Sequence, residues 1–120
     1  PNEKIYRSFE KFVNSLDNTD WIILYIFFEL NLIKELGYGF NFNDFKDHFK
    51  DKQNYQKIRI ENVDYEVPNF LIDQILPKDI EKLTIKKSLI FTRSLFQNKF
   101  FIPNNIVFPK SRIIFENYFN

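Results

Sequence analysis

One apolar stretch of the chain ends at its only two glycines. Residues 21–36 are apolar at most positions, Gly37 and Gly39 follow directly, and no other glycine occurs among the 120 residues. A helix that ends at Leu36 needs a residue with positive φ immediately after it, and glycine adopts that conformation without steric cost. The stretch therefore predicts a buried helix that Gly37 terminates, with Gly39 allowing a second unusual backbone step.

Hydrophobic spacing predicts the rest of the fold. A helical period covers residues 2–17, 78–101 and the segment from Pro109 to Phe119, and a short helix is expected at 69–76, stopped by Pro77. Residues 57–67 alternate, which predicts a hairpin that turns at residues 62–64, and residues 43–56 favour a loop or short helix. We therefore expect one mainly α domain over residues 1–120, with about five helices and a small β-hairpin insertion.

Positive charge gathers in the C-terminal part of the chain. Residues 1–75 carry 9 basic and 13 acidic side chains, whereas residues 76–120 carry 8 basic and 3 acidic ones. On the predicted helix 78–101, one side holds Ile80, Leu83, Phe91 and Leu95, and a basic stripe occupies the other. An ordinary solvated face explains such a stripe, and nucleic acid or an acidic partner is the alternative. The candidate binding residues are Lys78, Lys82, Lys86 and Arg93, extended by Lys110 and Arg112.

Glu29 falls on the apolar side of its predicted helix. At about 100° per residue it lies almost opposite the polar positions of that helix, so its carboxylate is expected to be desolvated and to need a partner or a proton. The simpler interpretation is a structural ion pair inside the fold, with Arg93 or Arg112 as the partner. The alternative is a catalytic acid.

The sequence lacks the residues that several kinds of functional site require. The chain has no cysteine and a single histidine, His48, so no zinc site and no cofactor are expected. The glycines close a helix and do not form a phosphate loop, and no serine lies in a nucleophile elbow. No apolar run reaches the length of a membrane span, and nothing resembles a signal peptide. The sequence thus favours a cytoplasmic binding or scaffold protein without enzymatic activity.

A set of ordered motifs resembles the helical part of RecO, the bacterial recombination mediator. The signature FE-x-x-L-L-x-x-L-G-Y-G is similar to Phe28-Glu29, Leu32-Ile33 and Leu36-Gly37-Tyr38-Gly39. Further along the chain, Phe91-Thr92-Arg93 and Lys110-Ser111-Arg112 resemble the basic helix of some members and the start of the last helix of the family. The resemblance covers nearly the whole chain and is weakest between Asn43 and Val67.

The resemblance implies a function as well as a fold. RecO proteins combine an N-terminal OB barrel with a helical domain, and only the helical part is expected in this chain. The family's role would be DNA repair and recombination mediation without enzymatic activity. The implied partners are RecR, single-stranded DNA and single-strand-binding protein, with annealing of complementary strands as a further activity.

Two departures from the family pattern concern metal and partner. Many members have a cysteine of their zinc site at the position of Phe45, so no metal is expected here. Some members have arginines before the FE pair, in the region that binds single-strand-binding protein, where this chain has Tyr25-Ile26-Phe27. The alternative function is a helical protein–protein interaction module without nucleic-acid binding.

Overall fold

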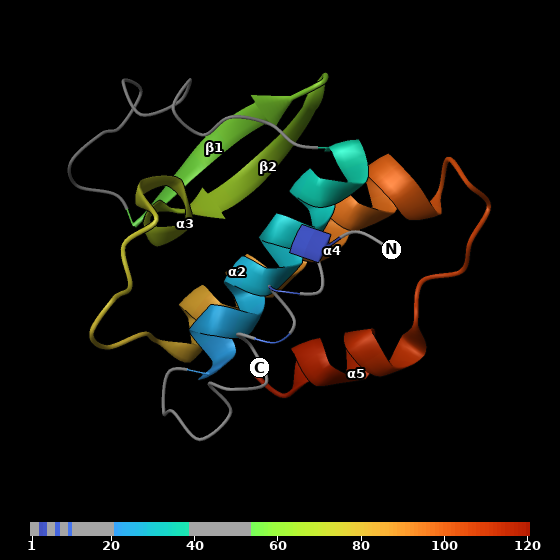
Figure 1. The fold of residues 1–120 in the computed structure, drawn as a ribbon. Coiled ribbons are helices and arrows are strands. Elements are labelled where there is room, and N and C mark those ends of the chain that lie inside the picture. Colours follow the sequence, from blue (N-terminus) through green and yellow to red (C-terminus); the bar gives the residue numbers. More distant parts are fainter. Residues whose placement is uncertain (1–2, 5–6, 8–9, 11–20, 39–53) are drawn as a thin grey trace. The chain divides into compact units, whose positions relative to one another are not determined.

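The computed structural model describes residues 3, 4, 7, 10, 21–38 and 54–120 (Figure 1). The chain forms two compact units, Pro1–Gly39 and Phe40–Asn120. Of the helix expected at residues 2–17, Glu3, Lys4, Arg7 and Glu10 have helical backbone, and its other residues lie outside the described ones. The predictions for Gly39, Phe45, His48 and residues 43–53 also lie outside the described residues.

The first unit contains the predicted apolar helix. This helix, α2 (Trp21–Ile33), continues as a wider π-type turn, η1 (Lys34–Tyr38). Its buried residues include Ile22, Ile26 and Ile33, which recur at helical spacing. Gly37 has φ of 87°, the left-handed conformation that ends the helix. The helix and its termination by Gly37 are therefore confirmed.

The second unit begins with a β-hairpin. Strands β1 (Tyr55–Ile60) and β2 (Val63–Pro68) pair antiparallel, with Ile60 opposite Val63. The two turn residues, Glu61 and Asn62, have φ of 48° and 68°, as a type I′ turn requires. The predicted hairpin is confirmed, but β1 begins at Tyr55, so the loop or short helix predicted up to residue 56 is wrong at Tyr55 and Gln56. The predicted turn at residues 62–64 is wrong because Val63 and Asp64 already belong to β2.

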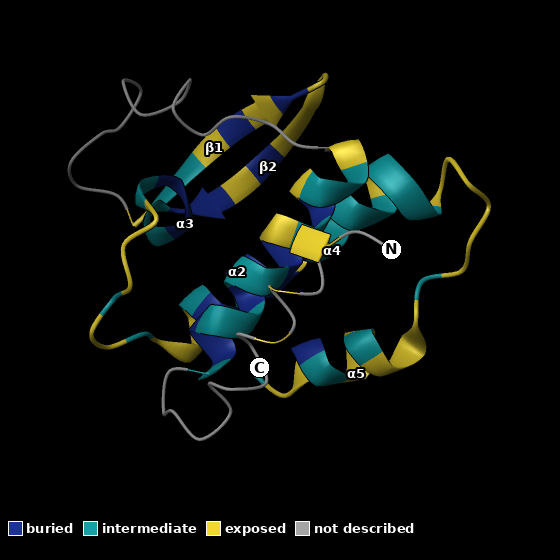
Figure 2. Ribbon diagram, in the orientation of Figure 1, coloured by how far each residue is buried: buried dark blue, intermediate teal, exposed yellow. Residues whose placement is uncertain are grey.

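Alternate side chains of the hairpin are buried. Figure 2 shows this alternation along both strands, with Ile58, Ile60, Tyr65 and Val67 on the buried face. The ring of Tyr65 meets Phe91 of helix α4 (Lys82–Phe96) edge to face, with ring centroids 5.6 Å apart. Such an aromatic pair contributes about 1 kcal/mol beyond the area that it buries. It fixes the hairpin to α4.

The connection between the hairpin and α4 differs from the prediction. Helix α3 (Asn69–Asp73) ends at Gln74, which has φ of 59°, so the helix stops before the predicted residue 76. Helix α4 begins at Lys82 after the extended cap Glu81, whereas the sequence predicted a start at Lys78. Pro77 and residues 79–81 line a pocket together with Asn69 and Phe70 of α3, and the backbone of Glu81 is extended, so the preference of Pro77 for a helix start does not decide where α4 begins.

Helix α4 contributes six buried residues to the second unit. Those residues recur at helical spacing and include Ile85, Leu89, Phe91 and Leu95. Leu83, predicted on the apolar side, is instead 55% exposed, because the buried face runs through Ile85 and Leu89. Beyond α4 the chain continues as a π-type turn, η3 (Gln97–Phe101), so the predicted end near residue 101 is confirmed.

The last helix, α5 (Lys110–Asn117), follows Pro109 as predicted. The described residues thus contain four α-helices, one fewer than the expected five, and one two-stranded antiparallel sheet. The mainly helical fold with a small hairpin is confirmed. The expectation of one domain over residues 1–120 depends on how the two units associate and stays a prediction.

Candidate nucleic-acid interface

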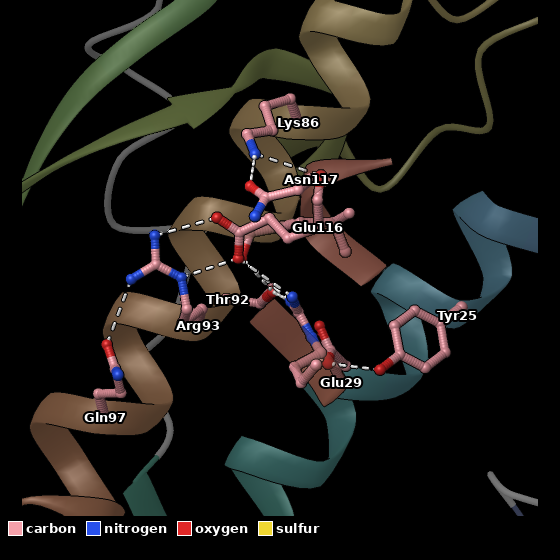
Figure 3. Close-up of polar contacts among 10 residues, drawn as sticks. Tyr25, Glu29, Lys86, Thr92, Arg93, Gln97, Glu116 and Asn117 are labelled. Atoms are coloured by element: carbon pink, nitrogen blue, oxygen red, sulfur yellow. Dashed lines mark hydrogen bonds and ion pairs between the residues drawn. The ribbon is translucent and has the colours of Figure 1, made fainter. Parts of the chain in front are cut away.

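Three of the six candidate basic residues, Lys86, Arg93 and Arg112, contact Glu116 of α5. Glu116 is 3% exposed and is the only residue of α5 that is buried. Arg93 of α4 donates two hydrogen bonds to it, from Nε to Oε2 at 2.8 Å and from Nη2 to Oε1 at 3.0 Å (Figure 3). This fork geometry is the strongest form of an arginine–carboxylate contact. It ties α5 to α4.

Arg112 adds further contacts between the two helices. Its Nη1 donates to Oε2 of Glu116 at 3.2 Å, and its Nη2 donates to the carbonyl oxygen of Leu89 at 3.1 Å and to Oγ1 of Thr92 at 3.2 Å. The side chain of Arg112 is 9% exposed. Its charge is therefore buried against α4 and satisfied by oxygen acceptors.

Lys86 completes what we call the Glu116 cluster, namely Lys86, Arg93, Arg112 and Glu116. Its ammonium group donates to the carbonyl oxygen of Glu116 at 3.2 Å and to Oδ1 of Asn117 at 2.9 Å (Figure 3). A cation at the last carbonyl groups of a helix is favourable for the helix dipole. Three of the six candidate binding residues thus make contacts that hold α5 in place.

The other three candidates extend into solvent. Lys78, Lys82 and Lys110 are all exposed. Lys82 is the first residue of α4 and Lys110 the first residue of α5, whereas Lys78 precedes α4. The predicted helical stripe is therefore wrong at Lys78, because the helix starts four residues later. A binding role for all six residues stays a prediction.

Two of the three structural residues predicted in the first unit, Glu29 and Gly37, are among the described residues. Glu29 is 8% exposed, so its predicted desolvation is confirmed, and its Oε2 accepts a hydrogen bond of 2.8 Å from the hydroxyl group of Tyr25 one turn earlier (Figure 3). The proposed partners Arg93 and Arg112 belong to the other unit, so that pairing stays a prediction. Gly37 has the positive φ expected of it.

Sequence reasoning missed Glu116. The one local signal was its position four residues after Arg112, a spacing at which opposite charges meet on a helix. The scarcity of acidic residues in this part of the sequence was a second signal, because Glu116 is the only one after Glu81. The contact with Arg93 spans 23 positions of the sequence, which helical periodicity does not report.

The described residues contain neither a candidate metal site nor a candidate membrane span. No cluster of three or more histidine, aspartate or glutamate side chains is placed to bind a metal ion there. Among the same residues, no helix has both the length and the apolar character needed to cross a bilayer.

Comparison with known families adds evidence for residues 1–52. This segment matches the family model of the recombination protein O C-terminal region. The resemblance drawn from the motif around Gly37 is therefore confirmed over these residues, which include α2 and η1. No curated protein and no solved structure matches the chain significantly.

The match to recombination protein O covers less than half of the chain. It ends before the hairpin, so the Glu116 cluster and the three exposed lysines lie outside it. It indicates a role in recombination and repair. The resemblance of Phe91-Thr92-Arg93 and Lys110-Ser111-Arg112 to this family stays a prediction.

Proposed function

We propose that this chain is the helical part of a RecO-type recombination mediator. In this role it helps RecR load recombinase onto single-stranded DNA coated by single-strand-binding protein, and it promotes annealing of complementary strands. It acts in the bacterial cytoplasm without enzymatic activity. The match of residues 1–52 to recombination protein O carries this proposal.

The charge of the C-terminal part supports contact with DNA. Lys78, Lys82 and Lys110 are exposed, whereas Lys86, Arg93 and Arg112 already have acceptors within the fold. Exposed lysines that neutralise phosphates release counterions, and this release makes affinity depend on salt but not on base sequence. We therefore assign the initial phosphate contacts to these three lysines.

A binding titration tests the proposal. Fluorescence anisotropy would follow the 120-residue chain as it binds a labelled oligothymidine and a mixed-sequence oligonucleotide, each at low and near-physiological salt. Similar affinity for both oligonucleotides, with steep weakening by salt, supports the proposal. Absence of binding even at low salt would contradict a DNA contact by this part of the mediator.

A protein–protein interaction module is the second candidate function. Apolar side chains lie exposed near and on α5, among them Val107 at 84%, Tyr118 at 80% and Ile114. Exposed apolar groups of this kind are typical of protein contact surfaces. Such a module would show no salt-sensitive binding to single-stranded DNA, so the same titration separates the two functions.

A further inference from the structure

A cleft runs between β2 and α4 within the second unit. It has a volume of about 470 Å³, and both elements contribute apolar and polar side chains to its walls. Three of its apolar side chains are solvent-accessible although they are large, namely Val63, Leu83 and Ile90. Leu83 and Ile90 lie seven residues apart on the same side of α4, about 10 Å along the helix. The cleft thus presents an apolar wall to a ligand.

The opposite wall is the outer edge of β2. Residues 63 to 66 all line the cleft, although their side chains alternate between the two faces of the hairpin, and no residue of β1 lines it. This pattern is expected if the cleft lies along the edge of β2, because side chains from both faces of a strand reach its edge. Four strand residues span about 10 Å from first to last, which matches the spacing of Leu83 and Ile90.

The backbone groups on this edge are open. The pair that flanks the two-residue turn, Ile60 and Val63, exchanges backbone hydrogen bonds, so every second pair along the hairpin does the same. The bond from the amide of Asn69 to the carbonyl oxygen of Asn54 fits that alternation. Asp64 and Glu66 therefore direct their N–H and C=O groups outward, and within the described residues these groups have no hydrogen-bond partner.

The charges around the cleft are already compensated. Its two carboxylates and two ammonium groups cancel in net charge: Asp64 pairs with Arg59, Glu66 pairs with Lys87, and Lys86 donates hydrogen bonds to neutral oxygen atoms at the end of α5. The lining therefore has no net charge that would select a polyanion or a strongly charged peptide. An uncharged occupant fits this lining best.

From these observations we propose that the cleft binds an extended, uncharged peptide segment of a partner protein, which adds to β2 as a third strand. The partner's backbone would pair with the N–H and C=O groups of Asp64 and Glu66. Its alternate apolar side chains would contact Leu83 and Ile90. Such strand addition combines backbone hydrogen bonds for affinity with side-chain pockets for selectivity. None of the three exposed lysines assigned to DNA lines this cleft.

A peptide titration followed by NMR tests this proposal. The probe is a blocked hexapeptide that alternates valine and threonine, added to the ¹⁵N-labelled 120-residue chain. We expect saturable shifts of the Asp64 and Glu66 amides. A control peptide with an N-methyl group on every residue has no N–H donor on either edge and should not bind. Equal binding of the methylated peptide, or no shift at these amides with the unmodified one, would overturn strand addition.

Two proline variants make a matched pair. Asp64→Pro removes an outward N–H from β2, and Arg59→Pro removes the corresponding N–H from the far edge of β1. Both variants lose the same surface ion pair, and neither loses a hydrogen bond within the hairpin. We expect Asp64→Pro to weaken peptide binding about tenfold, because a peptide carbonyl is left unpaired, and Arg59→Pro to leave it unchanged. Equal effects of the two would refute the proposal.

The apolar wall has its own control. Leu83→Ser should weaken peptide binding, whereas Ile114→Ser, a similar change at an exposed position on α5, should not. Two results would exclude a partner segment as the occupant. One is self-association of the chain that Asp64→Pro abolishes, which would make a second copy the occupant. The other is displacement of the peptide by an oligonucleotide.

Discussion

Arg93 on α4 and Glu116 on α5 form a two-pronged ion pair, with N–O distances of 2.8 and 3.0 Å. Glu116 is the one buried residue of α5, so this charged contact, with the help of Arg112, takes the place that apolar side chains usually have in helix docking. The attachment of α5 therefore depends on the charge of Glu116.

Glu116→Gln should strongly destabilise the second unit. The substitution keeps the size of the side chain but leaves two partly or fully buried guanidinium groups without their counter-charge, at a cost of about 3 kcal/mol. Urea unfolding followed by circular dichroism would measure this loss. Glu66→Gln, which removes an exposed partner of Lys87, is the control and should cost less than about 1 kcal/mol. Similar losses for both would contradict the account of α5 docking.

Two lysines on α4 should respond to the same substitution with opposite signs. Lys86→Met removes the ammonium group that binds the end of α5, so we expect a loss of about 1 kcal/mol and faster amide hydrogen exchange in α5. Lys82→Met removes a positive charge from the N-terminal turn of α4, where it opposes the helix dipole, and should stabilise by about 0.3 kcal/mol. Equal effects of both variants would mean that Lys86 does not hold α5.

Gly37→Ala should destabilise the first unit. A Cβ at this position would meet no atom within 4 Å, so the cost comes from the φ of 87° alone and should be about 1 kcal/mol. Thermal unfolding of the 120-residue chain would measure it. A neutral result would show that the end of α2 adopts another backbone conformation in solution.

Gln74→Gly tests the same principle with the opposite sign. Gln74 has φ of 59° at the end of α3, a conformation that costs a side-chain-bearing residue about 1 kcal/mol relative to glycine. We expect a higher midpoint of unfolding for the variant. Gln74→Ala keeps the penalty and serves as the control, so an equal gain from alanine would contradict the explanation.

Local patterns in the sequence predicted local structure well. The alternation of Ile58 and Ile60 with charged residues predicted the hairpin, and the position of Gly37 predicted where α2 ends. The start of α4 could not be predicted in this way, because the helix preference of Pro77 is a local signal and does not report the extended backbone of Glu81. A pattern of single residues reports exposure, but it does not report which residues meet across the fold.

The candidate site shows this limit most clearly. The basic stripe predicted one surface, yet Lys86, Arg93 and Arg112 make contacts inside the fold, whereas Lys78, Lys82 and Lys110 remain exposed. The deciding residue was Glu116, whose partner Arg93 lies 23 positions away. Helical periodicity places a charged side chain such as that of Arg93 on a polar face. It cannot distinguish a side chain that is solvated from one that forms an ion pair with a neighbouring helix.

The salt dependence of single-stranded DNA binding tests the central claim most directly. If Lys78, Lys82 and Lys110 each neutralise one phosphate, the logarithm of the association constant should fall with the logarithm of salt concentration with a slope of about −2. The double variant Lys82→Glu, Lys110→Glu should make that slope shallower, about −0.7 or closer to zero. The control Lys57→Glu, Arg59→Glu changes the net charge equally on the hairpin and should keep the slope near −2. A shallow slope for the unmodified chain, or equal slopes for the two double variants, would contradict DNA binding by these lysines.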